Sequence, residues 1–157
     1  MHLEIFSSFA NVSDDGDLLG DVEIDMKGRE YAISYLNPTN IIFDLSCNNI
    51  KGKIPTSISS MSHLRLLNLS HNKLEGKIPT SLSGISTLEQ MELEKNNLSG
   101  PIPEELSKLH ELAVLDVSSN NLCGKIPIGT QFSTFTVSSF ENNRPFMGLS
   151  FIIMQCK

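Results

Sequence analysis

A twelve-residue pattern recurs four times in this chain, and each copy starts 24 residues after the one before it. The copies are DLSCNNIKGKIP from Asp44, NLSHNKLEGKIP from Asn68, ELEKNNLSGPIP from Glu92 and DVSSNNLCGKIP from Asp116. A fixed period of this length indicates a stack of similar supersecondary units, each of which contacts only its neighbours. The repeat therefore favours a solenoid over an ordinary globular topology.

Apolar residues in each unit follow the spacing L-x-x-L-x-L-x-x-N, as in Leu64, Leu67, Leu69 and Asn72, except that the first copy has Asn40 at its first position. Alternation around the central pair predicts a short strand whose leucines point to one side and whose intervening residues point to the other. One such strand cannot bury its apolar face alone, whereas stacked copies form a sheet over a continuous leucine core. We therefore predict four parallel strands in one sheet, centred near Leu45, Leu69, Leu93 and Val117.

An asparagine follows each predicted strand, where its amide can pair with backbone groups that the bend leaves unpaired. This predicted structural ladder comprises Asn48, Asn72, Asn96 and Asn120. A glycine and an Ile-Pro pair come next in every copy. After the first three prolines, apolar residues spaced by three predict a short 3₁₀ or helical return on the outer face.

The full pattern L-x-x-L-x-L-x-x-N-x-L-x-G-x-I-P resembles the plant extracellular subclass of leucine-rich repeats, and it is matched four times over residues 40–127. IDMKGREYAISYLN at 24–37 is similar to the segment that leads from a non-repeat island into the last repeats of plant receptor-like proteins. IPIGTQFSTFTVSSFENN at 126–143 is similar to the end of their array. The resemblance implies an α/β solenoid with a short parallel β-sheet on its concave face and 3₁₀ or helical returns. It also implies the membrane-proximal end of an ectodomain, which in the full-length family lies on the extracellular face of the plasma membrane.

The resemblance divides the chain into an acidic head at 1–37, four repeats at 38–127 and a C-terminal flank with a degenerate cap at 128–157. The family pattern ends in a Gly-Leu-Cys-Gly cap with a second cysteine and then a membrane span. Here RPFMGLSFIIMQCK holds one cysteine, Cys156, and neither a span nor an N-terminal secretory signal is visible. We therefore expect a truncated form without a cysteine-bridged cap, which associates through the apolar FIIM segment.

Charge is distributed unevenly along the chain. The net charge of −6 comes from residues 1–30, which hold eight acids against Lys27 and Arg29, and the remaining residues are neutral overall. Neither part has the basic surface that a nucleic-acid-binding protein needs.

No motif in the chain predicts metal or catalytic chemistry. An EF-hand loop started at Asp15 would place Leu19 and Met26 where oxygen ligands are required. The four histidines lack metal-ligand spacing, and no serine lies in a nucleophile elbow. We therefore expect no enzyme activity, cofactor or metal.

The cysteines and the N-glycosylation sequons indicate whether the chain is exported from the cytosol. Cys47 and Cys123 occupy nearly equivalent positions three repeats apart. At ~4.8 Å per stacked strand they lie roughly 14 Å from each other, beyond the ~7 Å Cα limit for a disulfide. We therefore predict free thiols at both positions. N-x-S/T sequons predict glycosylation at Asn11, Asn68 and Asn97.

The predicted recognition surface is the strand face that the leucines do not use, because its residues vary while the scaffold repeats. Its candidate binding residues are Leu66, Asn68, Ser70, His71, Gln90, Glu92, Glu94, Lys95, Val114, Asp116, Ser118 and Ser119. The resemblance implies non-catalytic recognition of a protein or peptide ligand, and of a receptor-kinase co-receptor ectodomain, in plant defence or developmental signalling. Two alternatives stay open: a soluble protein similar to polygalacturonase inhibitors, and a remnant without a function of its own. The KGREY and GTQF segments favour the receptor interpretation.

Overall fold

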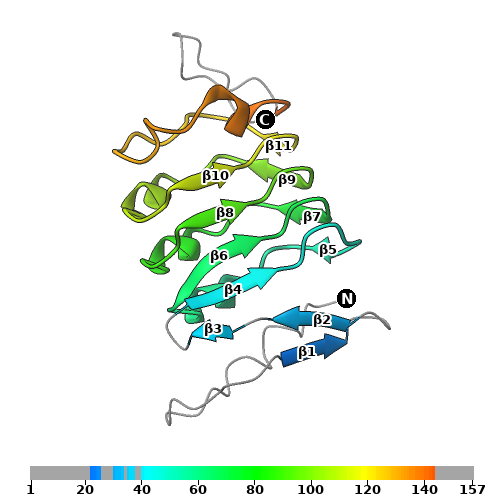
Figure 1. The fold of residues 1–157 in the computed structure, drawn as a ribbon. Coiled ribbons are helices and arrows are strands. Elements are labelled where there is room, and N and C mark those ends of the chain that lie inside the picture. Colours follow the sequence, from blue (N-terminus) through cyan, green and yellow to red (C-terminus); the bar gives the residue numbers. More distant parts are fainter. Residues whose placement is uncertain (1–21, 26–29, 34, 38–39, 144–157) are drawn as a thin grey trace.

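A computed structural model of the chain describes residues 22–25, 30–33, 35–37 and 40–143, with side chains from residue 41 onward. Successive repeats stack on one another, and Figure 1 shows their strands rising in chain order from β4 to β11. Each repeat contributes one strand to a first sheet and one strand to a second sheet beside it. The predicted solenoid is confirmed.

The first sheet holds the four predicted strands, β4 (Asn40–Asp44), β6 (Leu64–Asn68), β8 (Gln90–Glu92) and β10 (Val114–Asp116). All three pairings among them are parallel, as predicted. The strands end one residue before the predicted centres, so that Leu93, for example, follows β8. Backbone hydrogen bonds between the repeats nevertheless continue past the strand ends, since the Leu69 N–H donates to the Glu92 carbonyl at 2.9 Å.

The second sheet was not predicted from the sequence. Its strands β5 (Lys51–Gly52), β7 (Lys73–Gly76), β9 (Asn97–Gly100) and β11 (Asn121–Leu122) also pair in parallel. Gly76 and Gly100 end their strands at φ +83° and +84°, a backbone conformation that side chains with a Cβ rarely adopt. The chain turns there into the Ile-Pro pair and leaves the sheet.

Three 3₁₀ helices form the return segments, and each begins directly after the proline of an Ile-Pro pair. They are η2 (Thr56–Ser60), η3 (Thr80–Gly84) and η4 (Glu104–Lys108). Ile58, Leu82 and Leu106 point from them into the core and are fully buried, as are Leu67 and Met91 from the first sheet and Leu93 directly after β8. The spacing of three predicted a short 3₁₀ or helical return with one buried face, and the structure shows that all three are 3₁₀ helices.

The chain before the repeats adds antiparallel strands. β1 (Val22–Asp25) and β2 (Glu30–Ile33) form a two-stranded sheet, and β3 (Tyr35–Asn37) pairs with β4 at the edge of the first sheet. Residues 1–21 and 144–157 lie outside the described residues, and with them Asn11, Cys156 and the FIIM segment.

The asparagine ladder joins each repeat to the one before it. Asn96 Nδ2 donates to the carbonyls of Leu69 (2.9 Å) and Leu93 (3.1 Å), and Asn96 Oδ1 accepts from the Leu74 N–H at 2.9 Å. Asn72 and Asn120 repeat this pattern, and all three are buried. Asn48 is only half-buried, because it belongs to the first repeat.

A fifth turn of the solenoid follows the four repeats. Asn143 Nδ2 donates to the carbonyls of Val117 (2.9 Å) and Phe140 (3.0 Å), and its Oδ1 accepts from the Leu122 N–H at 3.0 Å. Asn143 therefore takes the ladder position above Asn120. In place of a strand this turn has the 3₁₀ helix η5 (Val137–Phe140), whose Phe140 is buried against the core.

The two cysteines of the repeats differ in their bonding, and one of the two predictions made for them is wrong. Cys47 is a free, exposed thiol, as predicted. Cys123 is disulfide-bonded, so the prediction of a free thiol there is wrong, and so is the expectation that no disulfide constrains the C-terminal end. The spacing argument excluded only a Cys47–Cys123 bond. Cys47 and Cys123 are the only cysteines among the described residues.

Candidate functional site

The candidate binding residues lie on the face of the first sheet that the leucines do not use, named here the concave face. Strand pairing places them in columns across the repeats. One column is mainly apolar and contains Ile42, Leu66, Gln90 and Val114. The next column is mainly acidic and contains Asp44, Asn68, Glu92 and Asp116. Val114 is 44% exposed, which is unusual for a large apolar residue in this fold.

Three residues of the acidic column also shape the backbone. Asp44, Asn68 and Asp116 each accept a hydrogen bond through Oδ1 from the N–H two residues later, at 2.8, 3.0 and 2.8 Å. Asp and Asn favour such turns because the short side chain reaches back to its own backbone. This structural role was missed in the sequence analysis, although the motifs D-L-S, N-L-S and D-V-S carried the signal.

Each unit then places one residue in the left-handed region, directly before the ladder asparagine. These residues are Cys47, His71, Lys95 and Ser119, with φ between 53° and 56°. Asn142, before Asn143, shares this conformation and so confirms the fifth turn. His71 and Lys95 are exposed at the end of the concave face, where the backbone bend fixes the direction of their side chains.

Glu94 differs from the other acids of the face. Its Oε2 atom is buried, and no hydrogen-bond partner for that atom lies within the described part of the chain. Burial raises the pKa of Glu94 above its ordinary value of 4.5, and the nearby charges of Asp116 and Glu92 raise it further. A hydrogen bond from Ser70 acts in the opposite direction.

Ser70 is removed from the set of candidate binding residues because it is buried. It is only 3% exposed, so its side chain supports Glu94 from within the repeat stack and does not present itself to a partner. The remaining candidates of the set are exposed or half-buried.

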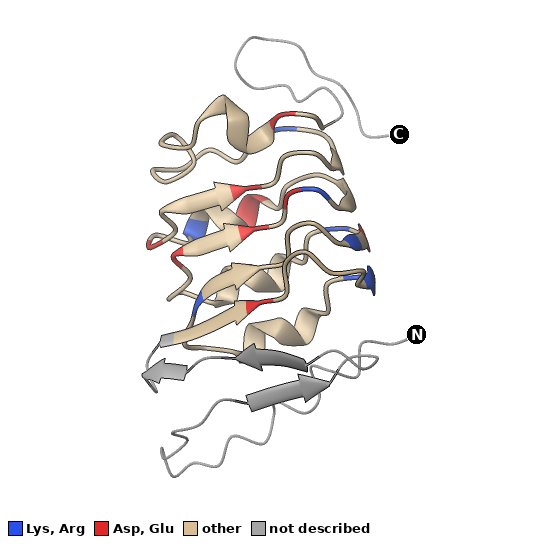
Figure 2. Ribbon diagram, turned by 45° about the vertical axis from the view of Figure 1, so that its right-hand side comes forward, with Lys and Arg blue, Asp and Glu red and all other residues tan. Residues whose placement is uncertain are grey.

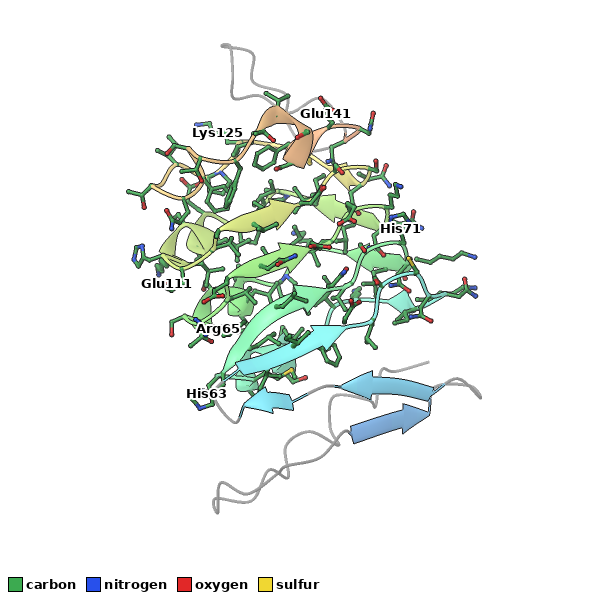
Figure 3. All side chains as sticks on the ribbon, viewed as in Figure 1. His63, Arg65, His71, Glu111, Lys125 and Glu141 are labelled. Atoms are coloured by element: carbon green, nitrogen blue, oxygen red, sulfur yellow. The ribbon has the colours of Figure 1, made fainter. Side chains whose placement is uncertain are left out.

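Arg65 and His71 mark the two ends of this face along the second repeat (Figure 3). Arg65 pairs with Glu89 of the following repeat, and both side chains remain largely exposed. Gln90 Nε2 donates to Glu92 Oε1 on the same strand. Polar side chains are therefore partly positioned by one another before any partner binds.

The two described sequons differ in their surroundings. Asn97 is exposed on the second sheet, away from the concave face. Asn68 is half-buried on the concave face, and its Oδ1 accepts the Ser70 N–H. A glycan at Asn68 would cover the candidate site, so the two predictions for Asn68 exclude each other.

The described residues hold no group of three or more His, Cys, Asp or Glu side chains placed to bind a metal ion. None of the helices that the structure describes is long and apolar enough to cross a membrane.

Comparison with known proteins connects this geometry to a family. Two models described as leucine rich repeat match residues 41–98 and 111–133, together just over half of the chain. No curated protein matches. The solved ectodomain of BIR2 from Arabidopsis thaliana is 35% identical with a TM-score of 0.64, over 68% of this chain and 56% of that one.

Two solved complexes from the same plant are also similar. A chain of the BIR3–SERK2 complex is 28% identical with a TM-score of 0.65, covering 98% of this chain and 90% of its own length. The receptor kinase HAESA, solved with the peptide hormone IDA and the co-receptor SERK1, is 33% identical with a TM-score of 0.61. That match covers 65% of this chain and 17% of the other, so the chain spans a small part of HAESA and 56% of the BIR2 ectodomain. This chain belongs to the leucine-rich repeat family and is similar to its plant receptor ectodomains.

Proposed function

We propose that this chain is a non-catalytic recognition module whose concave face contacts a protein or peptide ligand and the ectodomain of a co-receptor kinase. The observation that carries the proposal is the contrast between a repeating scaffold and a face that does not repeat. Leucines, ladder asparagines and Ile-Pro pairs recur at the same positions. The columns of the concave face instead change from repeat to repeat, as in Leu66, Gln90 and Val114 or in His71, Lys95 and Ser119. Variation confined to one face of a constant frame is typical of a binding surface.

Two further observations support this proposal. The similar structures include a complex with a peptide hormone and the co-receptor SERK1, and a complex of BIR3 with SERK2. The concave face also combines exposed apolar and charged side chains, which is the composition of a protein contact surface rather than of a catalytic cleft. We extend the proposal to plant defence or developmental signalling at the extracellular face of the plasma membrane.

The proposal is tested with the SERK1 and SERK2 ectodomains as probes in calorimetric titrations. The variant combines Glu92→Arg with Val114→Arg on the concave face. Its matched control combines Glu105→Arg on η4 with Ile128→Arg, which replaces an apolar residue that is 88% exposed.

We expect the concave variant to weaken binding at least about tenfold and the control to leave it within about twofold, because a charge reversal at an interface acts locally. If both variants lose the same affinity for the ectodomains, the ectodomains do not bind at the concave face. Failure of both ectodomains to bind the wild-type chain contradicts the co-receptor part of the proposal.

A further inference from the structure

The positive charges of the repeats gather away from the concave face. Between Asp44 and Glu89 the chain holds five Lys and Arg residues and a single acid, Glu75. Four of these five, Lys51, Lys53, Lys73 and Lys77, lie on or directly after the strands of the second sheet, and all four are exposed. We name them the lysine edge. Figure 2 shows acidic residues at the ends of first-sheet strands and basic residues along the far side, by β5 and β7.

The fold brings these lysines close together. The pairing of β5 with β7 sets Lys51 beside Lys73. Like charges at paired positions repel each other, and the described residues supply no carboxylate within 4.0 Å of any of the four lysines. The only acid of this strand pair is Glu75, so the edge carries a net charge of +3 from four lysines and one glutamate.

Two of the lysines are held in place by their stems. A Cβ atom at Gly76 would meet Lys53 Cγ at 3.0 Å, and a Cβ at Gly100 would meet Lys77 Cγ at 3.2 Å. Each aliphatic stem therefore lies on the glycine of the next repeat, while the ammonium group remains in water. A side chain that is already packed loses less conformational entropy when its charge is bound.

We propose that the lysine edge is a second binding site, distinct from the concave face, for a linear polycarboxylate chain such as an acidic polysaccharide. Lys53 and Lys77 occupy the same position of successive repeats, directly after Gly52 and Gly76. Together with the paired Lys51 and Lys73, they form a cluster of four ammonium groups on two neighbouring strands, which complements a polymer that carries one carboxylate per sugar unit. Lysine suits single carboxylates because its ammonium group is compact and does not require bidentate geometry.

Nucleic acid is the other linear polyanion, and the structure disfavours it. The chain has a net charge of −6 and a pI of about 5.1, whereas nucleic-acid-binding domains carry an extended basic surface. Cys123 is disulfide-bonded, which indicates an oxidising compartment outside the cytosol, where acidic polysaccharides rather than nucleic acids are abundant.

The test uses a decamer of galacturonic acid, its fully methyl-esterified form, and a single-stranded DNA oligonucleotide of the same charge number. Binding of the full chain is measured by calorimetry at about 20 and about 150 mM NaCl, since contacts between exposed charges weaken as salt rises. The variant is Lys77→Gln, which removes one charge of the edge. Its control, Lys108→Gln, removes the same charge from an exposed lysine on η4, outside the edge.

We expect the acid decamer to bind at low salt, the edge variant to weaken that binding about fivefold and the control to change it less than about twofold. The methyl ester should not bind. The proposal is overturned if the decamer does not bind, if both variants lose equally, if the ester binds as well, or if the oligonucleotide binds more tightly than the decamer. None of these outcomes affects the concave-face proposal, because both variants leave that face unchanged.

Discussion

At the scale of single residues, position relative to the core decides what a side chain does. Leu93 and Glu92 are neighbours in the third repeat, yet Leu93 is 0% exposed whereas Glu92 is half-buried on the concave face. The same alternation holds across the repeats, where the leucines fill the core and the residues between them face outward.

We predict that Leu93→Ala lowers the free energy of unfolding by about 2–5 kcal/mol, because it leaves a cavity in a fully packed core. Glu92→Ala should change it within about 0.5 kcal/mol, because the side chain reaches water. Urea unfolding of both variants measures the difference. Comparable losses would show that the two faces of the strand have been assigned the wrong way round.

Glu94 predicts a dependence of stability on pH. Its pKa is raised in the folded state, so the folded protein binds more protons than the unfolded chain in the interval above about pH 4.5. The contribution of Glu94 to stability therefore falls as pH rises through this interval and is least favourable once the carboxylate is ionised in both states.

We expect Glu94→Gln to stabilise the protein at about pH 7 relative to the wild type, and this advantage should shrink towards about pH 4. Glu105→Gln on η4, where the side chain is exposed, is the matched control. Urea unfolding at several pH values provides the measurement, and a difference that does not vary with pH would rule out burial of the Glu94 carboxylate as the cause.

At the scale of elements, each ladder asparagine fastens its own turn to the preceding one. The fifth turn shows that this function does not depend on a strand, because η5 replaces the strand while Asn143 keeps the ladder bonds. The spacing of three residues from Phe140 to Asn143 equals that from Leu93 to Asn96, and this was the signal available in the sequence.

Asn143→Ala is expected to cost about 1–3 kcal/mol, since it leaves the Leu122 N–H without its acceptor and removes one of the two hydrogen bonds to the Val117 carbonyl, which keeps the one from Asn120. Asn121→Ala, at an exposed position of β11, serves as the control and should have little effect. Hydrogen exchange at the Leu122 amide reports the loss directly. If that amide is equally protected in both variants, the fifth turn is not held by the ladder.

At the scale of the whole molecule, the solenoid has two chemically different sides and two different ends. Acids line the ends of first-sheet strands, and lysines line the second sheet, so the net charge of −1 over the repeats, eight Lys and Arg against nine Asp and Glu, conceals a separation of charge (Figure 2). One end is covered by β3, which pairs antiparallel to β4, and the other by the fifth turn with the disulfide-bonded Cys123 close before it.

Cys123→Ser should therefore reduce stability by about 2–4 kcal/mol, because a disulfide restricts the unfolded chain. Cys47→Ser changes only a free, exposed thiol and should have little effect. Urea unfolding with and without a reductant distinguishes the two, since reduction should bring the wild type to the stability of Cys123→Ser. If the reductant has no effect on the wild type, the disulfide does not stabilise the fold.

The sequence alone determined the repeat length, the parallel first sheet, the buried leucines and the ladder from Asn72 to Asn120, because a period of 24 residues imposes the same local environment on every copy. Only the tertiary structure decided what depends on a particular neighbour. The burial of Ser70 and of Glu94 Oε2 and the half-burial of Asn48 each follow from which residues stack above or below. A repeat pattern specifies the average unit, whereas ends and surfaces are where units differ.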